Sequence, residues 1–476
     1  MLKKRNEFEE RIGRLRSDLW AEIREDRLAP GDFLLSERML SQKYNLSHIS
    51  VRKVLAELEE AGLVEKMPGK GTKVKARLPE KVQKTLRAAS YGDSHENPII
   101  RSLLKSYTEL HPEVAIDFTA IPAGAYLDTV FDALEKNCSS FDVLFLSDLH
   151  FRTLVERGLE GSLQSWESSK EELFDHLYPQ TLRMFRNTEQ KAIPFAFSPV
   201  VYCYNKKLVC EDELNALSTW PGLLEVAKRH TIKDEAGNIQ QYGFGFSISN
   251  HRWPLYLLQN EGGFVSGDGR RSRLSDPKTV EAFQFCLDLM YEVQASPIFV
   301  QGSTRFAESL FLKEKVAFLL TTYYFMNEFA SSELVWDIVP VIPSGVQAAT
   351  LMIGTGIAVP SDSEHKEEAA RLIRYLTSKP AQETLKLRGN TIPANRDAAE
   401  DQSLLQSSVH PSRYPLFEKL LPYVHSLLEL EMSPSEMGRL QEELFLMWMN
   451  MEKPHDACRR IERDWLIEAK GLTVQD

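Results

Sequence analysis

The sequence has few cysteines and no long apolar run. Its five cysteines, in 476 residues, are widely spaced, and the closest pair, Cys203 and Cys210, fits no zinc pattern. We therefore expect reduced thiols. No stretch reaches the roughly 20 apolar residues of a membrane helix, and the first residues do not form a secretory signal. These absences predict a cytoplasmic protein with no membrane contact.

Common catalytic motifs are missing as well. There is no phosphate-binding loop, no complete dinucleotide-binding glycine pattern, no His-Glu-x-x-His and no Gly-x-Ser-x-Gly. The glycine pairs at 243–245 and 354–356 lack a third glycine, and the eleven histidines are scattered. The sequence therefore predicts no catalytic site, no cofactor and no metal site.

What is present is the composition of a globular protein too long for one domain. Hydrophobic residues make up 43% and charged residues 26%, and the length predicts two or three domains. Residues 1–77 carry 17 Lys and Arg against 13 Asp and Glu, a net charge of +4. Because the whole chain has a net charge of −11, the remaining residues carry −15. The sequence thus predicts a small basic head on an acidic body, and only the head suits phosphate groups.

The head has the pattern of three helices followed by a hairpin. The spacing of apolar residues and the position of turn residues predict a helix over 8–28, a second from Ser36 with Met39 and Leu40 inward, a third over 47–58, and a β-hairpin over 63–75. Polar groups near the start of the third helix suit contacts with base edges in a DNA major groove.

The head resembles the GntR family of bacterial regulators along its whole length. The resemblance rests on LAPGD at 28–32, SER at 36–38, LSHISVRKVL at 46–55, GLV at 62–64 and GKGT at 69–72. It implies a winged helix-turn-helix that binds operator DNA. Two positions depart from the family pattern: Leu35 replaces a proline, and His48 replaces an arginine.

The resemblance also implies which residues contact DNA. Arg38 matches a contact from the second helix, Ser47 and Ser50 match hydroxyl contacts, Arg52 matches the principal base or phosphate contact, and Gly69 matches the wing-tip glycine of the minor groove. The remaining candidates, chosen for position and charge, are His48, Lys53 and Lys70. Because histidine is shorter and conditionally charged, we expect an altered operator preference.

The body, after a linker at 78–84, alternates strands with helices. Strands are predicted over 85–91, 114–118 and 141–146, and a helix over 99–110. This alternation favours an α/β fold with a mainly parallel sheet, whose ligands sit at the carboxyl ends of strands. The last sixty residues are predicted to be largely helical, with an interruption at Pro422, and to complete a second lobe.

The body resembles the extracellular solute-binding proteins of sugar ABC transporters. The matching segments, in the family's order, are FDVLFLSD at 141–148, GL at 158–159, IP at 193–194, VYCYNK at 201–206, TWPGLL at 219–224, YGF at 242–244, NEGG at 260–263, FLKEKVAF at 311–318, IGTGIA at 353–358 and EAA at 368–370. The resemblance implies a bilobal fold of the type II periplasmic-binding-protein class, with crossing strands between lobes that close on a ligand.

Residues that follow these segments are the candidates for binding the ligand. Sugars are held by aromatic faces and by polar side chains, and the candidates are Asp148, Phe195, Ser198, Trp253, Tyr323, Tyr324, Gly354 and Thr355. The resemblance implies that the last two form a glycine loop across the cleft. Trp253 is equally consistent with packing, Asp148 with capping a helix, and Gly354 with a bend.

Together these features predict an α/β protein with a winged helix-turn-helix at 1–77, a linker at 78–84 and a bilobal domain at 85–476. We expect a homodimer on a palindromic operator, regulated by a small solute, most simply a sugar. One alternative is a regulator with an aminotransferase-like, pyridoxal phosphate-dependent body, although the Asn-Pro pair at 97–98 does not continue as that motif requires. Another is a solute receptor of an ABC transporter, against which the absent signal and lipid-anchor cysteine argue.

Overall fold

The computed structural model divides the chain into two compact units, Met1–Gln83 and Lys84–Asp476. It describes residues 11–12, 14–16, 18–20, 22–23, 27–60, 63–67, 70–75, 84–136, 140–167, 172–266, 271–297, 305–329, 332–341 and 347–466. Most of the predicted linker and the wing-tip Gly69 lie outside these residues. None of the described helices combines the length and apolar character needed to cross a bilayer.

The first unit contains the helices and the hairpin expected from its sequence. The described residues between 11 and 23 are helical, and they precede α2 (Glu37–Tyr44), α3 (His48–Glu60), β1 (Val64–Met67) and β2 (Gly71–Val74). Ser36 caps α2 by accepting a hydrogen bond from the Met39 amide. Leu40 is fully buried as predicted, but Met39 is 51% exposed, so its predicted inward position is wrong. Helical periodicity is the reason, because adjacent residues point about 100° apart.

A third chain segment, residues 32–34, is hydrogen-bonded to the hairpin. β1 and β2 pair antiparallel, and Phe33 bridges Lys73 on the outer side of β2. The backbone of Leu34 donates to the Thr72 carbonyl at 2.8 Å, and the Val74 amide donates to the Asp32 carbonyl at the same distance. These bonds tie the segment before α2 to the wing.

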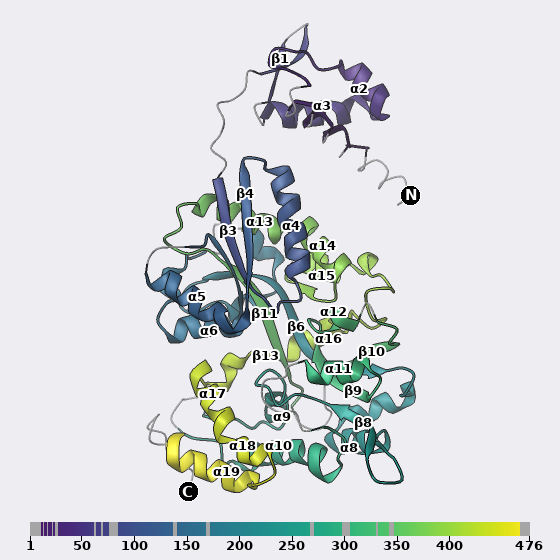
Figure 1. Cartoon of the computed structure of the whole chain (residues 1–476), viewed down its shortest axis with the longest axis vertical. Helices are drawn as coiled ribbons and strands as arrows, with labels where there is room; N and C mark the ends of the chain where they lie inside the picture. Colours follow the sequence, from purple (N-terminus) through teal and green to yellow (C-terminus); the bar gives the residue numbers. More distant parts are fainter. Residues whose placement is uncertain are drawn as a thin grey trace. The chain divides into compact units, whose positions relative to one another are not determined.

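The second unit begins with a parallel sheet covered by helices, at one end of this unit in Figure 1. β3 (Lys84–Tyr91) pairs in parallel with both β4 (Val114–Ile121) and β5 (Val143–Ser147). The helices of this first lobe are α4 (Asn97–Leu110), α5 (Ala123–Glu135), α6 (Asp148–Glu156), α13 (Lys366–Leu376), α14 (Lys379–Arg388) and α15 (Arg396–Glu400).

Two antiparallel strands, β6 (Ala192–Asn205) and β11 (Thr350–Ala358), cross from the first lobe to the second. All fourteen residues of β6 are buried, as expected for a strand covered on both faces. The pairing of the two strands is irregular at Thr355, where one extra residue of β6 is accommodated. Such bulges bend a strand and redirect its side chains.

The second lobe is built on the far half of β6. Its strands are β7 (Ile232–Lys233), β8 (Ile239–Gly245), β9 (Val316–Thr322) and β10 (Trp336–Val339), and its helices are α8 (Trp220–Arg229), α9 (Pro254–Gln259), α10 (Pro277–Leu287), α11 (Phe306–Leu312) and α12 (Met326–Phe329). β9 and β10 pair antiparallel with β6, and β8 pairs in parallel with β9.

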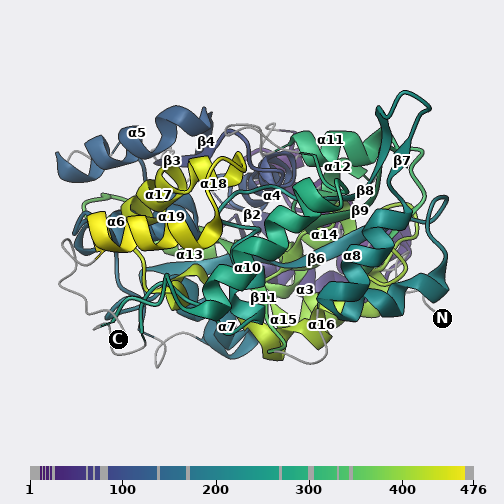
Figure 2. The same ribbon diagram turned by 90° about the horizontal axis from the view of Figure 1, so that it is seen from below.

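The C-terminal helices complete the second lobe. α17 (Pro434–Glu443), α18 (Phe445–Trp448) and α19 (Pro454–Ile461) lie beside α10 in Figure 2, and their apolar residues share one core with this lobe. Before them, α16 (Leu416–Leu420) ends just ahead of Pro422, where the helix was expected to break. Short pieces complete the chain: α7 (Pro179–Met184), β12 (Ile392–Pro393) and β13 (Val424–His425).

Candidate functional sites

The first site is the exposed N-terminal turn of α3. Ser47 precedes this helix, and its hydroxyl accepts a hydrogen bond from the Ser50 amide at 3.2 Å and shares another with the Ser50 hydroxyl at 2.8 Å. This cap fixes the start of the helix. His48, Arg52 and Lys53 are exposed in its first two turns. Hydroxyls, an imidazole and two cations are therefore gathered on one accessible surface.

Glu37 links this surface to the wing. Its carboxylate accepts from the Arg52 Nε at 2.7 Å and from the Lys66 Nζ of β1 at 3.4 Å. These bonds, with that from Arg52 foremost, hold the pKa of Glu37 below its ordinary value. One carboxylate thus orients basic groups from α3 and from the hairpin.

We expect Glu37→Gln to lower the specificity for the operator and to raise the affinity for DNA of any sequence. Removing the charge releases Arg52 and Lys66, so binding to random duplex DNA should strengthen severalfold with a steeper salt dependence, while discrimination between operator and random sequence falls. Fluorescence anisotropy on both duplexes across a salt series measures this. An unchanged ratio of the two affinities would argue against an orienting role.

The other expected DNA contacts lie in the same unit. Arg38 is exposed in the first turn of α2, and Lys70 is exposed beside the hairpin turn, where its amide donates to the Met67 carbonyl at 3.0 Å. Gly69 lies outside the described residues. The structure therefore gathers Ser47, Ser50 and Arg52 at one helix start, with Arg38 on the preceding helix.

The second site is a cleft of about 220 Å³ between the two lobes of the body. Its walls come from β11 and from the segments that follow the carboxyl ends of β3, β5, β8 and β9, which is where α/β sheets bind ligands. The lining residues are Tyr91, Asp93, Ser94, His95, Glu96, Ser147, Asp148, Ser247, Ser249, His251, Arg252, Tyr324, Phe325, Ile353, Gly354 and Thr355.

Four of the expected ligand residues meet in this cleft: Asp148, Tyr324, Gly354 and Thr355. The Thr355 hydroxyl lies 3.2 Å from the hydroxyls of both Tyr91 and Tyr324, and the Gly354 amide donates to Asp148 Oδ1 at 3.2 Å. Gly354 and Thr355 belong to the strand β11, so the expected glycine loop is wrong. The strand β11 forms the floor instead, and its Gly354 amide and Thr355 hydroxyl are bonded to side chains of the walls.

The other four expected ligand residues do not line the cleft, because they are buried in cores. Phe195 packs on Phe145, with ring centroids 5.7 Å apart. Trp253 packs among Phe264, Phe283 and Trp448. The Ser198 hydroxyl accepts from the Tyr323 amide, and the Tyr323 hydroxyl donates to the Tyr414 carbonyl.

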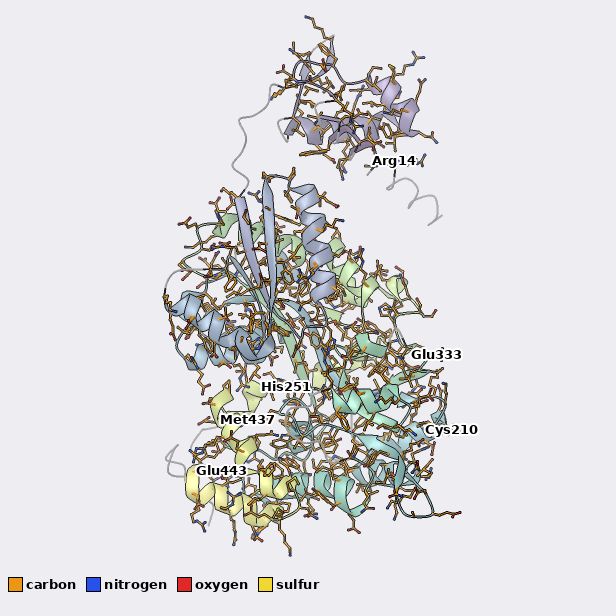
Figure 3. All side chains as sticks on the ribbon, in the orientation of Figure 1. Arg14, Cys210, His251, Glu333, Met437 and Glu443 are labelled. Atoms are coloured by element: carbon orange, nitrogen blue, oxygen red, sulfur yellow. The ribbon has the colours of Figure 1, made fainter. Side chains whose placement is uncertain are left out.

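On the wall from the second lobe, Tyr324 was anticipated from the sequence, whereas Arg252 and His251 were not. Arg252 is only 5% exposed; its guanidinium donates to the His251 carbonyl at 3.1 Å and lies 3.8 Å from the buried Glu308. His251, which lies between the two lobes in Figure 3, is half-buried, and desolvation lowers its pKa to about 4. It therefore faces the cleft as a neutral imidazole near pH 7.

The first lobe contributes a further set that the sequence analysis missed, in the segment after β3. Burial lowers the pKa of His95 to about 4 and raises that of Glu96. Glu96 accepts from the hydroxyls of Ser94 and Thr391. The rule that singled out Asp148, a polar residue directly after a predicted strand, would have found this set and Ser247 as well.

Asp148 is a second buried carboxyl of the cleft with a raised pKa. It lies in the first turn of α6 and is 4% exposed. Burial raises its pKa from the ordinary 3.8 to about 6, although the Gly354 amide and nearby Arg152 oppose the shift. A buried carboxylate that costs stability, in a cleft, is typical of a functional group.

This cost predicts the effect of Asp148→Asn. A raised carboxyl pKa means that the native state binds the proton more tightly than the unfolded chain, so the stability cost is absent below pH 4 and complete above pH 6. The variant should therefore unfold with a free energy higher by up to about 3 kcal/mol at pH 8, and with a much smaller difference at pH 4. Denaturant titrations followed by tryptophan fluorescence test this; a variant less stable than wild type at pH 8 would contradict it.

The two lobes also touch at the margins of the cleft. On one side Arg305 Nη2 donates to the Asp93 carbonyl at 3.5 Å. On the other, Arg152 of α6 donates to the Met432 carbonyl, and Glu156 accepts from the Ser435 amide at 3.2 Å. α6 therefore connects the cleft, at Asp148, with the start of the C-terminal helices.

Comparison with known families identifies both parts of the chain. Residues 91–383 match the family model described as bacterial extracellular solute-binding protein, and residues 12–74 match that of bacterial regulatory proteins, gntR family. The chain belongs to the solute-binding protein family and carries a GntR helix-turn-helix domain at its N-terminal side. The sequence resemblances are thereby confirmed, and the solute-binding fold takes the place of the aminotransferase alternative.

Solved structures share the fold of the body. An ABC substrate-binding protein from Listeria monocytogenes in complex with cycloalternan is 20% identical, with a TM-score of 0.68 over 82% of this chain and 100% of that one. A solute-binding protein from Thermotoga lettingae bound with alpha-D-tagatose (18%, TM-score 0.68) and a maltose/maltodextrin-binding domain from Bdellovibrio bacteriovorus bound to maltotriose (16%, TM-score 0.65) each cover 80% of this chain and 98% of theirs. The predicted mixed α/β class is confirmed. No curated protein matches the chain in sequence.

Proposed function

We propose that this protein is a transcriptional regulator whose operator binding is controlled by a small solute, most simply a sugar, held between the lobes of its body. The observation that carries the proposal is the cleft: hydroxyls, carboxylates and a guanidinium from both lobes face it beside the rings of Tyr91, Tyr324 and Phe325. Sugars are recognised by this combination of aromatic faces and directed hydrogen bonds.

The GntR domain supports DNA as the macromolecular partner and a cytoplasmic location. In this account residues 1–77 bind the operator, residues 78–84 connect, and residues 85–476 sense the solute. A homodimer would place two copies of α3 on half-sites one helical turn apart. A ligand that binds one arrangement of the lobes more tightly than another shifts the population of that arrangement, and the linker carries the change to the head.

The contact residues proposed for DNA are Arg38, Ser47, His48, Ser50, Arg52, Lys53, Gly69 and Lys70. Those proposed for the solute are Asp148, Tyr324, Gly354 and Thr355, joined by Arg252 and His251 from the second lobe. Asp148 of the first lobe and Arg252 of the second come from opposite walls, so they can contact one ligand together only when the lobes are close. Ligand binding and lobe arrangement are thus coupled.

A thermal-shift screen tests the solute. The panel contains glucose, maltose, maltotriose, tagatose and cycloalternan, and buffer without any saccharide is the reference. At about 100 times its dissociation constant a ligand should stabilise the body by about 2.7 kcal/mol. No stabilisation by any saccharide would exclude sugars of this panel as effectors.

A further inference from the structure

One exposed apolar side chain on α3 has no role in the core. Ile49 is 80% exposed, whereas the other large apolar residues of the same helix are at most 7% exposed: Val51, Val54, Leu55 and Leu58. Exposing a large aliphatic side chain forgoes the stabilisation that its burial would give. A side chain in this position is therefore a candidate for contact with a partner.

Helix geometry places Ile49 beside the cations. At 100° per residue, Ile49 shares one face with Arg52 and Lys53, three and four positions on, and with the exposed Ala56. This face is opposite the buried one. Arg52 is already oriented by Glu37, at 2.7 Å.

The charge of this face identifies the kind of partner. Two cations flank Ile49, in a head with a net charge of +4, so a polyanion is favoured over an apolar protein surface. Phosphates and most base edges in the major groove are polar; the apolar group exposed there is the C5-methyl of thymine. The first turn of a recognition helix is the part that reaches base edges.

We propose that Ile49 is a specificity-determining residue that contacts the methyl group of one thymine in each operator half-site. The inference rests on the proposed DNA-binding function. This contact recognises a group that hydrogen bonds do not reach. Uracil and thymine offer the same hydrogen-bonding groups and differ only in that methyl group, so replacing one by the other isolates the contact.

Single-atom changes in DNA test the contact directly. The full chain first selects its operator from a random duplex pool, and each thymine of a half-site is then replaced by uracil. Replacing one particular thymine by uracil should lower the affinity of the wild-type protein for the duplex about three- to tenfold. Ile49→Ala should lose a similar factor on the unmodified operator and no more on the uracil duplex.

Met39→Ala is the matched control, because Met39 is also exposed and apolar but lies on α2. It should keep the full uracil effect, and equal melting temperatures of the variants confirm folding. The proposal is overturned if no uracil substitution weakens wild type, or if Ile49→Ala keeps the uracil effect. If Ile49→Ala changed the oligomeric mass measured by sedimentation but not DNA binding, the side chain would belong to a protein interface and the proposal would also be overturned. Failure to select any operator would instead refute DNA binding itself.

Discussion

Replacing Arg52 by alanine is expected to weaken operator binding by about 1–3 kcal/mol, roughly 5- to 150-fold. The side chain projects from the exposed face of the recognition helix, and its ion pair with Glu37 limits the conformations that it can adopt before DNA arrives. A guanidinium held in this way loses less entropy on forming a bidentate bond to guanine or phosphate. Anisotropy titrations at several salt concentrations measure both the loss and its origin.

The salt dependence separates the two kinds of contact. A base contact should relax the preference at one operator position and leave the salt slope nearly unchanged, whereas a phosphate contact should weaken all sequences alike and reduce the slope by about one. Lys43→Ala is the matched control, since Lys43 lies in the last turn of α2 and pairs with Glu22. Equal losses for Arg52→Ala and Lys43→Ala would contradict a special role for Arg52.

Asp148→Asn is expected to lower affinity for the saccharide found in the screen by about 1.5–3 kcal/mol, more than tenfold, with operator binding intact. The carboxylate accepts from the Gly354 amide and lines the cleft, where it can also accept from a ligand hydroxyl. An amide is a weaker acceptor and carries no charge. The same variant should be more stable without ligand at pH 8, so stability and binding should change in opposite directions.

Asp132→Asn provides the control for this prediction. Asp132 lies on α5, is largely exposed and pairs with Lys136, away from the cleft residues. Its replacement should change neither saccharide affinity nor the pH dependence of unfolding. Calorimetric titration gives the affinities. If both variants bound the saccharide as wild type does, Asp148 would have no part in the site.

Much of the secondary structure could be predicted from the sequence, because caps, helix breaks and buried faces each depend on residues close together in the chain. The start of β3, the buried face of α3, the cap at Ser36 and the break at Pro422 each depend on a few neighbouring residues. The position of Asp148 in the cleft also followed, since a polar residue directly after a buried strand lies at the edge of the sheet.

The misplaced ligand residues show where local sequence stops being informative. Trp253 and Tyr324 are both aromatic residues shortly after strands, yet Trp253 packs against Trp448, almost two hundred positions later, while Tyr324 faces the cleft. The packing of α18 and of Phe264 and Phe283 around Trp253 decides the first case, and the residues next to Trp253 do not reveal it. Arg252, adjacent to Trp253, takes the position in the cleft instead.

In the proposed function, one chain couples solute binding to operator binding. The most direct test is the operator affinity of the full-length protein, measured by anisotropy with and without the saccharide that stabilises it. The account predicts a change of at least about fivefold, the effect of 1 kcal/mol of coupling, and its loss in Asp148→Asn. An operator affinity that stays constant while the saccharide demonstrably saturates the cleft would contradict the account.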